Sequence, residues 1–278
     1  MDRHAAERRT RTAATLIPGS VAYPQQMQTL GIDLAAQPEK TGVAWLEWAA
    51  GKARVTELHV GASDEMLLEA MAKASKTGID CPLGWPREFV AFVSKHQDDH
   101  VAVEPGLAAD WRRRLSYRVT DLHVKSTVPG IQGLSVSSDR IGVTTMRCAA
   151  LLSQLAALGA PVVRTGSGPV AEVYPGASLV RWGFSHKGYK GSKAKIRRSQ
   201  LVDELLLAAP WLDLGANEGR CRASDDALDA VLASLTARAA ALGLTEPIPA
   251  GDQRAAEIEG WIALPTEGSR LAELVEPR

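Results

Sequence analysis

The chain has 278 residues with 45% hydrophobic content, which suits one large domain or two small ones with an ordinary core. Lysine and arginine total 32, and so do aspartate and glutamate, so no overall charge attracts nucleic acid and any basic surface must be local. Three widely spaced cysteines argue against a disulfide framework or a four-cysteine zinc site, and no apolar run approaches the roughly 18 residues that cross a bilayer, so we expect a soluble cytoplasmic protein.

The N-terminal stretch, residues 1–26, is rich in arginine, alanine and threonine and shows neither a helical nor an alternating pattern. We expect a mobile leader there. Its composition faintly suggests a transit peptide, but Met27 lies just before the first expected strand and favours a misassigned start. Residues 27–278 are then expected to form a single domain.

Apolar and alternating patterns predict strands early in this domain, at residues 31–34, 41–46, 54–60 and 78–84. A helix is expected from Ser63, which can cap it, to near Gly78. Another helix is expected after Pro86, because proline suits the first helical turn.

The following stretch, from about residue 98 to 139, has little periodicity, so we treat it as a loop-rich insertion. Beyond it, the patterns predict a helix at 145–158, strands at 161–164 and 170–174, a helix that ends near 209 and a long helix from Ser224. From all these elements we expect an α/β fold with a mixed five-stranded sheet flanked by helices.

Carboxylates inside expected strands are the first candidates for a functional site, because a buried charge is costly unless something neutralises it. They are Asp33, Asp80 and Glu172. Asp226 and Asp229 lie three residues apart on the last expected helix, so both can face one site. If the fold brings these acids together, ionised neighbours 4 Å apart would repel by about 4 kcal/mol per pair at an effective dielectric of 20. Protonation or a hard divalent cation must then relieve the repulsion.

Carboxylates without histidine or cysteine favour Mg²⁺ or Mn²⁺ over zinc. Two such ions about 3.5–4 Å apart commonly promote in-line displacement at phosphorus, so the residues indicate phosphodiester hydrolysis. Structural explanations stay open: Asp33 and Asp80 could hold loop amides at strand ends, and Asp226 could favour the helix dipole. His96 and His100 could ligate zinc, but no third ligand is evident and we do not expect it.

A run of basic side chains between residues 186 and 198 contains no acid and lies beside Phe184. This composition is compatible with binding a phosphate backbone, and equally with a solvated face. The candidates for nucleic-acid binding are Lys187, Lys190, Lys193 and Arg197 in this run and Arg118 in the insertion. Arg118 could instead pair with Asp121.

Several short motifs, in one order, resemble the DUF429 family of predicted nucleases with a ribonuclease H-like fold. The motifs are residues 31–34, 79–84, 118–121, 172–177, 224–230 and 259–262, and the resemblance covers roughly residues 28–265. In the broader ribonuclease H-like class the catalytic acids lie on the first strand, the fourth strand and a later helix. The resemblance therefore implies Asp33, Asp80 and Asp226 or Asp229, although Cys81 stands where a small residue such as alanine is expected.

These observations lead us to expect a metal-dependent nuclease with two Mg²⁺ or Mn²⁺ ions and a nucleic-acid substrate. Asp33 would bridge the ions, Asp80 and Asp229 would hold one each, and Asp226 or Glu172 would complete the set of ligands.

Two alternatives are an actin-like nucleotide-dependent kinase and a nonenzymatic nucleic-acid-binding protein that kept the fold. Residues 31–33 and the turn at 41–42 resemble the first phosphate loop of the kinases, but no second glycine-rich hairpin is present in the sequence.

Overall fold

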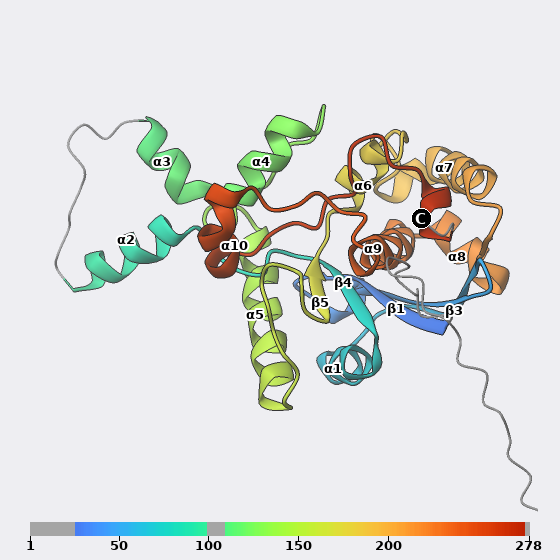
Figure 1. Cartoon of the computed structure of the whole chain (residues 1–278), viewed down its shortest axis with the longest axis horizontal. Coiled ribbons are helices and arrows are strands. Elements are labelled where there is room, and N and C mark those ends of the chain that lie inside the picture. Colours follow the sequence, from blue (N-terminus) through green and yellow to red (C-terminus); the bar gives the residue numbers. More distant parts are fainter. Residues whose placement is uncertain (1–25, 99–108, 276–278) are drawn as a thin grey trace, which may run out of the picture.

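The centre of the fold is strand β1 (Gln26–Asp33), seen in a computed structural model that describes residues 26–98 and 109–275 (Figure 1). Its side chains alternate between the two faces of a sheet. Leu30 and Ile32 pack in one core, and Met27 packs in the other. The expected leader lies outside the described residues except for Gln26, and His100 lies outside them as well.

Within the described residues the sheet has six strands, in the order β5-β4-β1-β2-β3-β6, so the expected count of five is wrong. The other strands are β2 (Gly42–Ala49), β3 (Lys52–Val60), β4 (Lys76–Asp80), β5 (Val170–Glu172) and β6 (Leu212–Asp213). Pairing is antiparallel along β1-β2-β3 and parallel for β1-β4, β4-β5 and β3-β6, so the sheet is mixed, as expected. Residues 161–164 do not form the expected strand, and the two-residue β6 is too short to leave a pattern in the sequence.

Ten α-helices occur in the described part of the chain. They are α1 (Asp64–Lys73), α2 (Arg87–Gln97), α3 (Ala109–Ser116), α4 (Val119–Thr127), α5 (Ile141–Ala157), α6 (Pro175–Arg181), α7 (Lys195–Ala208), α8 (Glu218–Ala223), α9 (Asp225–Ala241) and α10 (Gln253–Glu259). Helices α3 and α4 lie in the segment that we expected to be loop-rich. Within residues 26–98 and 109–275, no helix combines the length and apolarity needed to cross a membrane.

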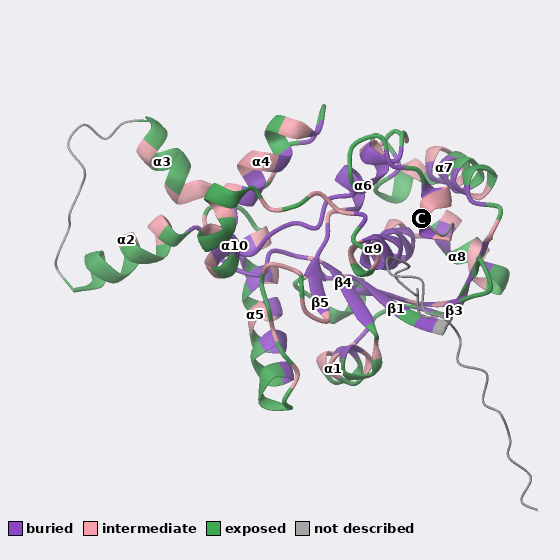
Figure 2. Ribbon diagram, viewed as in Figure 1, coloured by how far each residue is buried: buried purple, intermediate pink, exposed green. Residues whose placement is uncertain are grey.

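Helices cover both faces of the sheet (Figure 1). On one face α1 and α5 enclose a core with Leu67, Leu151 and the β1 side chains Leu30 and Ile32. On the other face α9 lies directly on the strands, with α6, α7 and α8 outside it. Every residue of α9 from 227 to 239 is buried, as the purple ribbon in Figure 2 shows. This helix is therefore a central part of the core.

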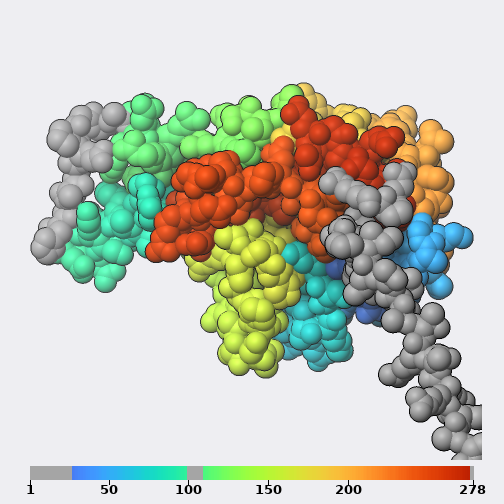
Figure 3. All heavy atoms as spheres, in the orientation of Figure 1, coloured from blue at the N-terminus to red at the C-terminus, as the bar shows by residue number. Residues whose placement is uncertain are grey.

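The C-terminal segment after α10 returns to the edge of the sheet beside β5. Ile262 forms an isolated parallel bridge with Glu172, and the Ala263 N–H donates to the Glu172 carbonyl oxygen at 2.8 Å. In Figure 3 this segment, orange to red, runs across the face that the view presents. The outer edge of β5 is thus covered by the chain itself.

Candidate metal centre

Two carboxylates meet where β1 and β4 end. Asp33 and Asp80 are the last residues of these parallel strands and are direct partners in their register. Residues in register on parallel neighbouring strands point to the same face, so both side chains face α9. The sequence prediction that these two acids share a site is supported by this pairing.

Three glycines on the sheet allow the backbone of α9 to approach closely enough to bring a third carboxylate to this point. A methyl group at Gly31, Gly42 or Gly78 would overlap a carbonyl oxygen of α9, at Ala230, Asp226 and Ala233 respectively. These glycines lie on β1, β2 and β4. The helix therefore rests on main chain where larger side chains would hold it away.

Polar contacts fix α9 along its length. Ser224 caps its N-terminus by accepting a hydrogen bond from the Ala227 N–H at 3.3 Å, as the sequence predicted. Farther along, the Ser234 and Thr29 hydroxyls lie 2.7 Å apart, and Thr29 also accepts from the Trp48 indole N–H at 2.8 Å. The position of the helix over β1 is thereby set at two points.

Asp229 completes a group of three carboxylates from two strands and one helix. Ligand oxygens of Asp33, Asp80 and Asp229 all lie within 4.8 Å of one another. Asp229 is buried, whereas Asp33 and Asp80 remain partly exposed. Asp226 does not belong to this group; it lies one turn earlier, where the Ser224 hydroxyl donates to it at 3.4 Å.

A tyrosine and a lysine contact Asp229 from the loop before α7. The Tyr189 hydroxyl donates to Asp229 Oδ1 at 2.7 Å, and Lys190 Nζ lies 2.7 Å from Oδ2. Tyr189 is fully buried, while the side chain of Lys190 is 54% exposed. Lys190 thus reaches from solvent into the carboxylate group and neutralises part of its charge.

Arg198 holds this loop in place. Its Nη1 donates to the carbonyl oxygens of Tyr189 and Gly191 at 2.8 and 3.2 Å. Asp225 accepts a hydrogen bond from the Gly191 N–H at 2.9 Å, which ties the same loop to the start of α9. Asp225 therefore has the structural role that its position at a helix start favours.

The carboxylates interact strongly enough to shift their pKa values. Burial, then the charges of Asp229 and Asp80, raise the pKa of Asp33 well above its ordinary value. Burial and Asp229 also raise the pKa of Asp80, to about 7, although Lys190 opposes the shift. Burial, the largest single influence, lowers the pKa of Lys190, but Asp229, Tyr189 and Asp80 together outweigh burial and raise that pKa above its ordinary value. The group therefore favours an added proton or cation.

Glu172 is not one of the three grouped carboxylates, although its charge helps to raise the pKa of Asp80, so its expected place among the metal ligands is not supported. Its partner in the β4-β5 register is Ile79, one residue before Asp80, and its side chain therefore leaves the opposite face of the sheet. Both of its oxygens bind the Arg118 guanidinium, at 2.6 and 2.7 Å, and Oε2 also accepts from the Leu83 N–H at 3.0 Å.

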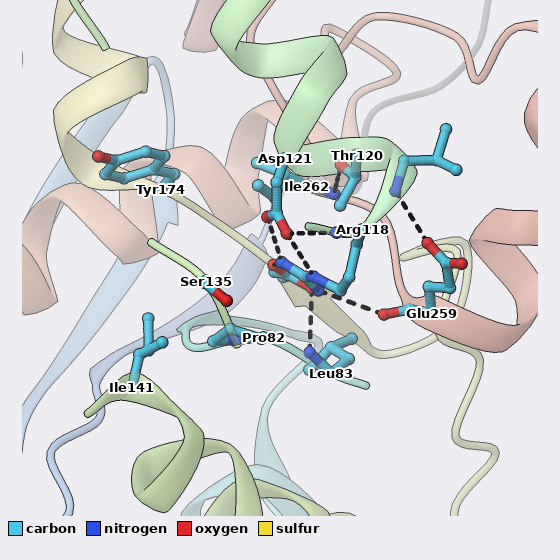
Figure 4. A network of polar contacts seen from close by, with 12 residues as sticks. Pro82, Leu83, Arg118, Thr120, Asp121, Ser135, Ile141, Tyr174, Glu259 and Ile262 are labelled. Carbon is cyan, nitrogen blue, oxygen red and sulfur yellow. Dashed lines mark hydrogen bonds and ion pairs between the residues drawn. The ribbon is translucent and has the colours of Figure 1, made fainter. Parts of the chain in front are cut away.

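Arg118 lies at the centre of this network and is 1% exposed. Its Nε and Nη2 donate to Asp121 at 3.1 and 2.8 Å, and Nη1 also donates to the Glu259 carbonyl oxygen at 3.2 Å (Figure 4). With the two bonds to Glu172, all five guanidinium N–H groups have acceptors. The assignment of Arg118 to nucleic-acid binding is wrong, and the alternative of an ion pair with Asp121 is confirmed.

The basic run divides into side chains with different surroundings. Arg197 binds Glu204 through two hydrogen bonds, at 2.8 and 3.2 Å, and Arg198 is buried. Lys187 and Lys193 are exposed. These two lysines keep the role expected from the sequence, as the run's candidates for a phosphate backbone.

Sequence reasoning missed that Tyr189 and Lys190 both contact Asp229, although Lys190 has the surface exposure that was expected. The local signal for a different role is the pair Gly188 and Gly191, which flank these two residues and both have positive φ, at 74° and 90°. Such glycines mark tight turns that can direct intervening side chains inward. The three glycines under α9 also had a signal, since each lies within or at the start of an otherwise apolar strand.

The donor set fits a hard divalent cation. Three carboxylates supply only oxygen ligands, and their mutual repulsion is the cost that such an ion would remove.

A family model described as a protein of unknown function, DUF429, matches residues 31–254. No curated protein matches the chain, and no solved structure does.

Proposed function

The chain belongs to the DUF429 family, and we propose that it is a metal-dependent nuclease of ribonuclease H-like fold that hydrolyses phosphodiester bonds of nucleic acids. One observation carries the proposal: ligand oxygens of Asp33, Asp80 and Asp229 lie within 4.8 Å of one another. Their placement, at the ends of the first and fourth strands and on a late helix, is the one that the sequence resemblance implied.

The three carboxylates would hold Mg²⁺ or Mn²⁺, with Asp226 one turn away as an additional ligand if two ions bind. When bound, such ions polarise a phosphoryl oxygen and lower the pKa of a coordinated water. Tyr189 fixes the orientation of Asp229 through its hydroxyl. Lys190 places a positive charge at the same carboxylate, beside the position that an anionic substrate oxygen would approach.

The buried cysteines support the proposed location. Cys81, Cys148 and Cys221 are all buried free thiols. Free thiols are compatible with the reducing cytoplasm, which we retain as part of the proposal.

The nonenzymatic alternative also has a specific observation in its favour. Lys190 already neutralises part of the charge on Asp229, so the fold can tolerate the carboxylate group without an ion. The kinase alternative gives Asp229 no role.

The proposal is tested by incubating labelled single-stranded, duplex, hybrid and branched DNA and RNA with Mg²⁺, Mn²⁺ or EDTA. Cleavage of at least one substrate is expected with metal and not with EDTA. Asp33→Asn should abolish it, whereas Asp203→Asn, which removes only an exposed ion pair with Arg222, should not. Binding without cleavage under all conditions would favour the nonenzymatic alternative.

A further inference from the structure

A cavity of about 200 Å³ opens beside the carboxylate group. Asp80 and Lys190, which belong to that group, form part of its lining. Figure 4 shows other parts of the lining: Tyr174 and Ile141 lie on one side, and the pair of Arg118 and Asp121 lies on the other. The cavity is therefore continuous with the proposed metal centre.

The polar groups at the inner end of the cavity are already hydrogen-bonded to one another or to the main chain. All five N–H groups of Arg118 have protein acceptors, and the Tyr174 hydroxyl donates to the Gln132 carbonyl oxygen at 3.3 Å. Arg118 is 1% exposed, so the group that can still offer a ligand a flat face is the aromatic ring of Tyr174, which is partly exposed. Such faces bind planar rings by stacking and with little preference among them.

The remaining walls are mostly apolar. Val124, Val173 and Ile262 are buried in the lining, and Leu134 lines the cavity with 57% of its surface exposed. A ligand in the cavity would cover this leucine and remove apolar surface from water. The walls therefore favour a ligand that is both planar and weakly polar on its faces.

The size of the cavity limits the ligand to about one ring system. Pockets for drug-sized ligands have volumes of about 300–1,000 Å³, so 200 Å³ is too small for a whole nucleotide. A base inside a duplex is stacked and cannot enter, whereas an unpaired or extruded base can.

We propose that this cavity binds one unpaired nucleobase of a nucleic-acid strand while the adjoining backbone phosphate lies at Asp80 and Lys190. The inference rests on the proposed function and adds a substrate class: strands with a single-stranded or flipped nucleotide next to the bond that is cut. The base is held by its faces, so the preference is for unpaired structure and not for sequence.

The first experiment uses single-stranded oligonucleotides with one abasic residue placed at successive positions. Because stacking of one base contributes about 1–3 kcal/mol, the abasic residue next to the cut should reduce cleavage there by about 5- to 150-fold. The same residue several positions away should have little effect. A matched duplex should be cut more slowly than the single strand.

The variants are chosen to change the cavity without disturbing the fold. A Cβ at Gly133 would lie 3.4 Å from Asp121 Cβ, an ordinary contact, so Gly133→Ala narrows the lining without overlap. Leu134→Ser removes the exposed apolar wall. Leu158→Ser is the matched control, since Leu158 is 69% exposed and is not part of the lining.

The second experiment measures binding without cleavage. Thermal unfolding in Mg²⁺ is compared with adenosine 5′-monophosphate and with ribose 5-phosphate, which lacks the base. The nucleotide should raise the melting temperature more than the sugar phosphate does. In Gly133→Ala and in Leu134→Ser, the nucleotide and the sugar phosphate should raise the melting temperature equally, while the shift caused by Mg²⁺ alone should remain. Leu158→Ser should behave like the wild type in both respects.

The two proposals fail separately. Base-dependent binding without any cleavage would uphold the base site and overturn the nuclease assignment. Cleavage that is insensitive to abasic residues, to duplex structure and to the two variants would uphold the nuclease and overturn the base site. Absence of cleavage together with equal shifts from both phosphates would overturn both.

Discussion

Asp33 and Asp80 are partners in the parallel register of β1 and β4, so each of these neighbouring strands ends in a carboxylate that faces the same helix. Asp229 approaches both from α9, and the oxygens of all three lie within 4.8 Å of one another. The fold thus confines three acids where burial and repulsion both oppose ionisation, which raises the pKa of Asp33 and of Asp80.

Asp33→Asn should stabilise the protein in EDTA, because it removes one charge from this group and keeps the shape. The gain is offset partly by any amide hydrogen left without an acceptor. With free Mg²⁺ a hundredfold above its dissociation constant, the wild type should gain about 2.7 kcal/mol and the variant clearly less. Thermal unfolding with and without metal measures both effects. Equal metal-induced shifts in the two proteins would remove Asp33 from the metal centre.

The apoprotein should lose stability as pH rises from about 4 to about 7. The pKa of Asp80 is raised from 3.8 to about 7, so over this range the folded state holds a proton that the unfolded state has released. The free energy of unfolding then falls with rising pH and levels off above about 7. Denaturant unfolding of wild type and Asp80→Asn in EDTA reports this contribution together with the change at Asp33, whose pKa the charge of Asp80 helps to raise. The variant's advantage should grow from pH 4 to 7; a constant difference would contradict the prediction.

Lys190→Met should destabilise the apoprotein and increase its dependence on metal. The substitution leaves Asp229 without its cation, which should cost about 1–2 kcal/mol because the lysine is half exposed and the pair is partly solvated. Lys193→Met is the control, an exposed lysine in the same run. In EDTA, Lys190→Met should lower the melting temperature and Lys193→Met should not. In Mg²⁺, the decrease in melting temperature caused by Lys190→Met should be smaller. A similar loss in metal and in EDTA would show that Lys190 does not compensate the carboxylates.

Gly31→Ala should disrupt the contact between α9 and the sheet. Its methyl group would overlap the Ala230 carbonyl oxygen, which is main chain and cannot rotate away, so the cost should be about 3 kcal/mol or more. Gly219→Ala, in α8 with nothing near the added carbon, should instead stabilise by about 0.5–1 kcal/mol. Chemical denaturation gives both values. A mild effect at Gly31, with metal binding intact, would show that α9 can shift without loss of the site.

Lys187 and Lys193 should account for the salt dependence of nucleic-acid binding by the basic run. Replacing both with methionine should weaken binding. It should also make the negative slope of log affinity against log salt less steep, by about 0.7–0.9 for each phosphate that the variant no longer neutralises. Replacing Arg197 should change the slope less, because Glu204 already binds its guanidinium. An unchanged slope in the double variant would identify the run as a solvated face.

The part of the site that lies on regular elements could be predicted from the sequence. Asp33 and Asp80 each end an apolar strand, and Asp229 lies beyond the first turn of a capped helix. The type and position of these elements were enough to identify the three acids as candidates for one site. Glu172 shows the limit of this reasoning. It also lies in a strand, but only the register with β4 determines its face, and a shift of one residue reverses it.

Charged residues outside regular patterns could not be placed in the same way. The segments of Arg118 and Lys190 lack periodicity, which favours a surface position, yet Arg118 is enclosed by oxygen acceptors from three parts of the chain and Lys190 reaches Asp229. Most of these partners are distant in sequence. The helices α3 and α4 and the strand β6 were missed because they are short and depend on packing that a local window does not contain.

The outer strands of the sheet affect how the protein behaves at high concentration. Strand β5 has three residues and β6 has two, and Ile262 and Ala263 bond to the free side of β5. Long unpaired edges let separate molecules join through backbone pairing, and short or covered edges prevent it. The β5 side of the sheet should therefore resist strand-mediated aggregation, even though the central strands are strongly apolar.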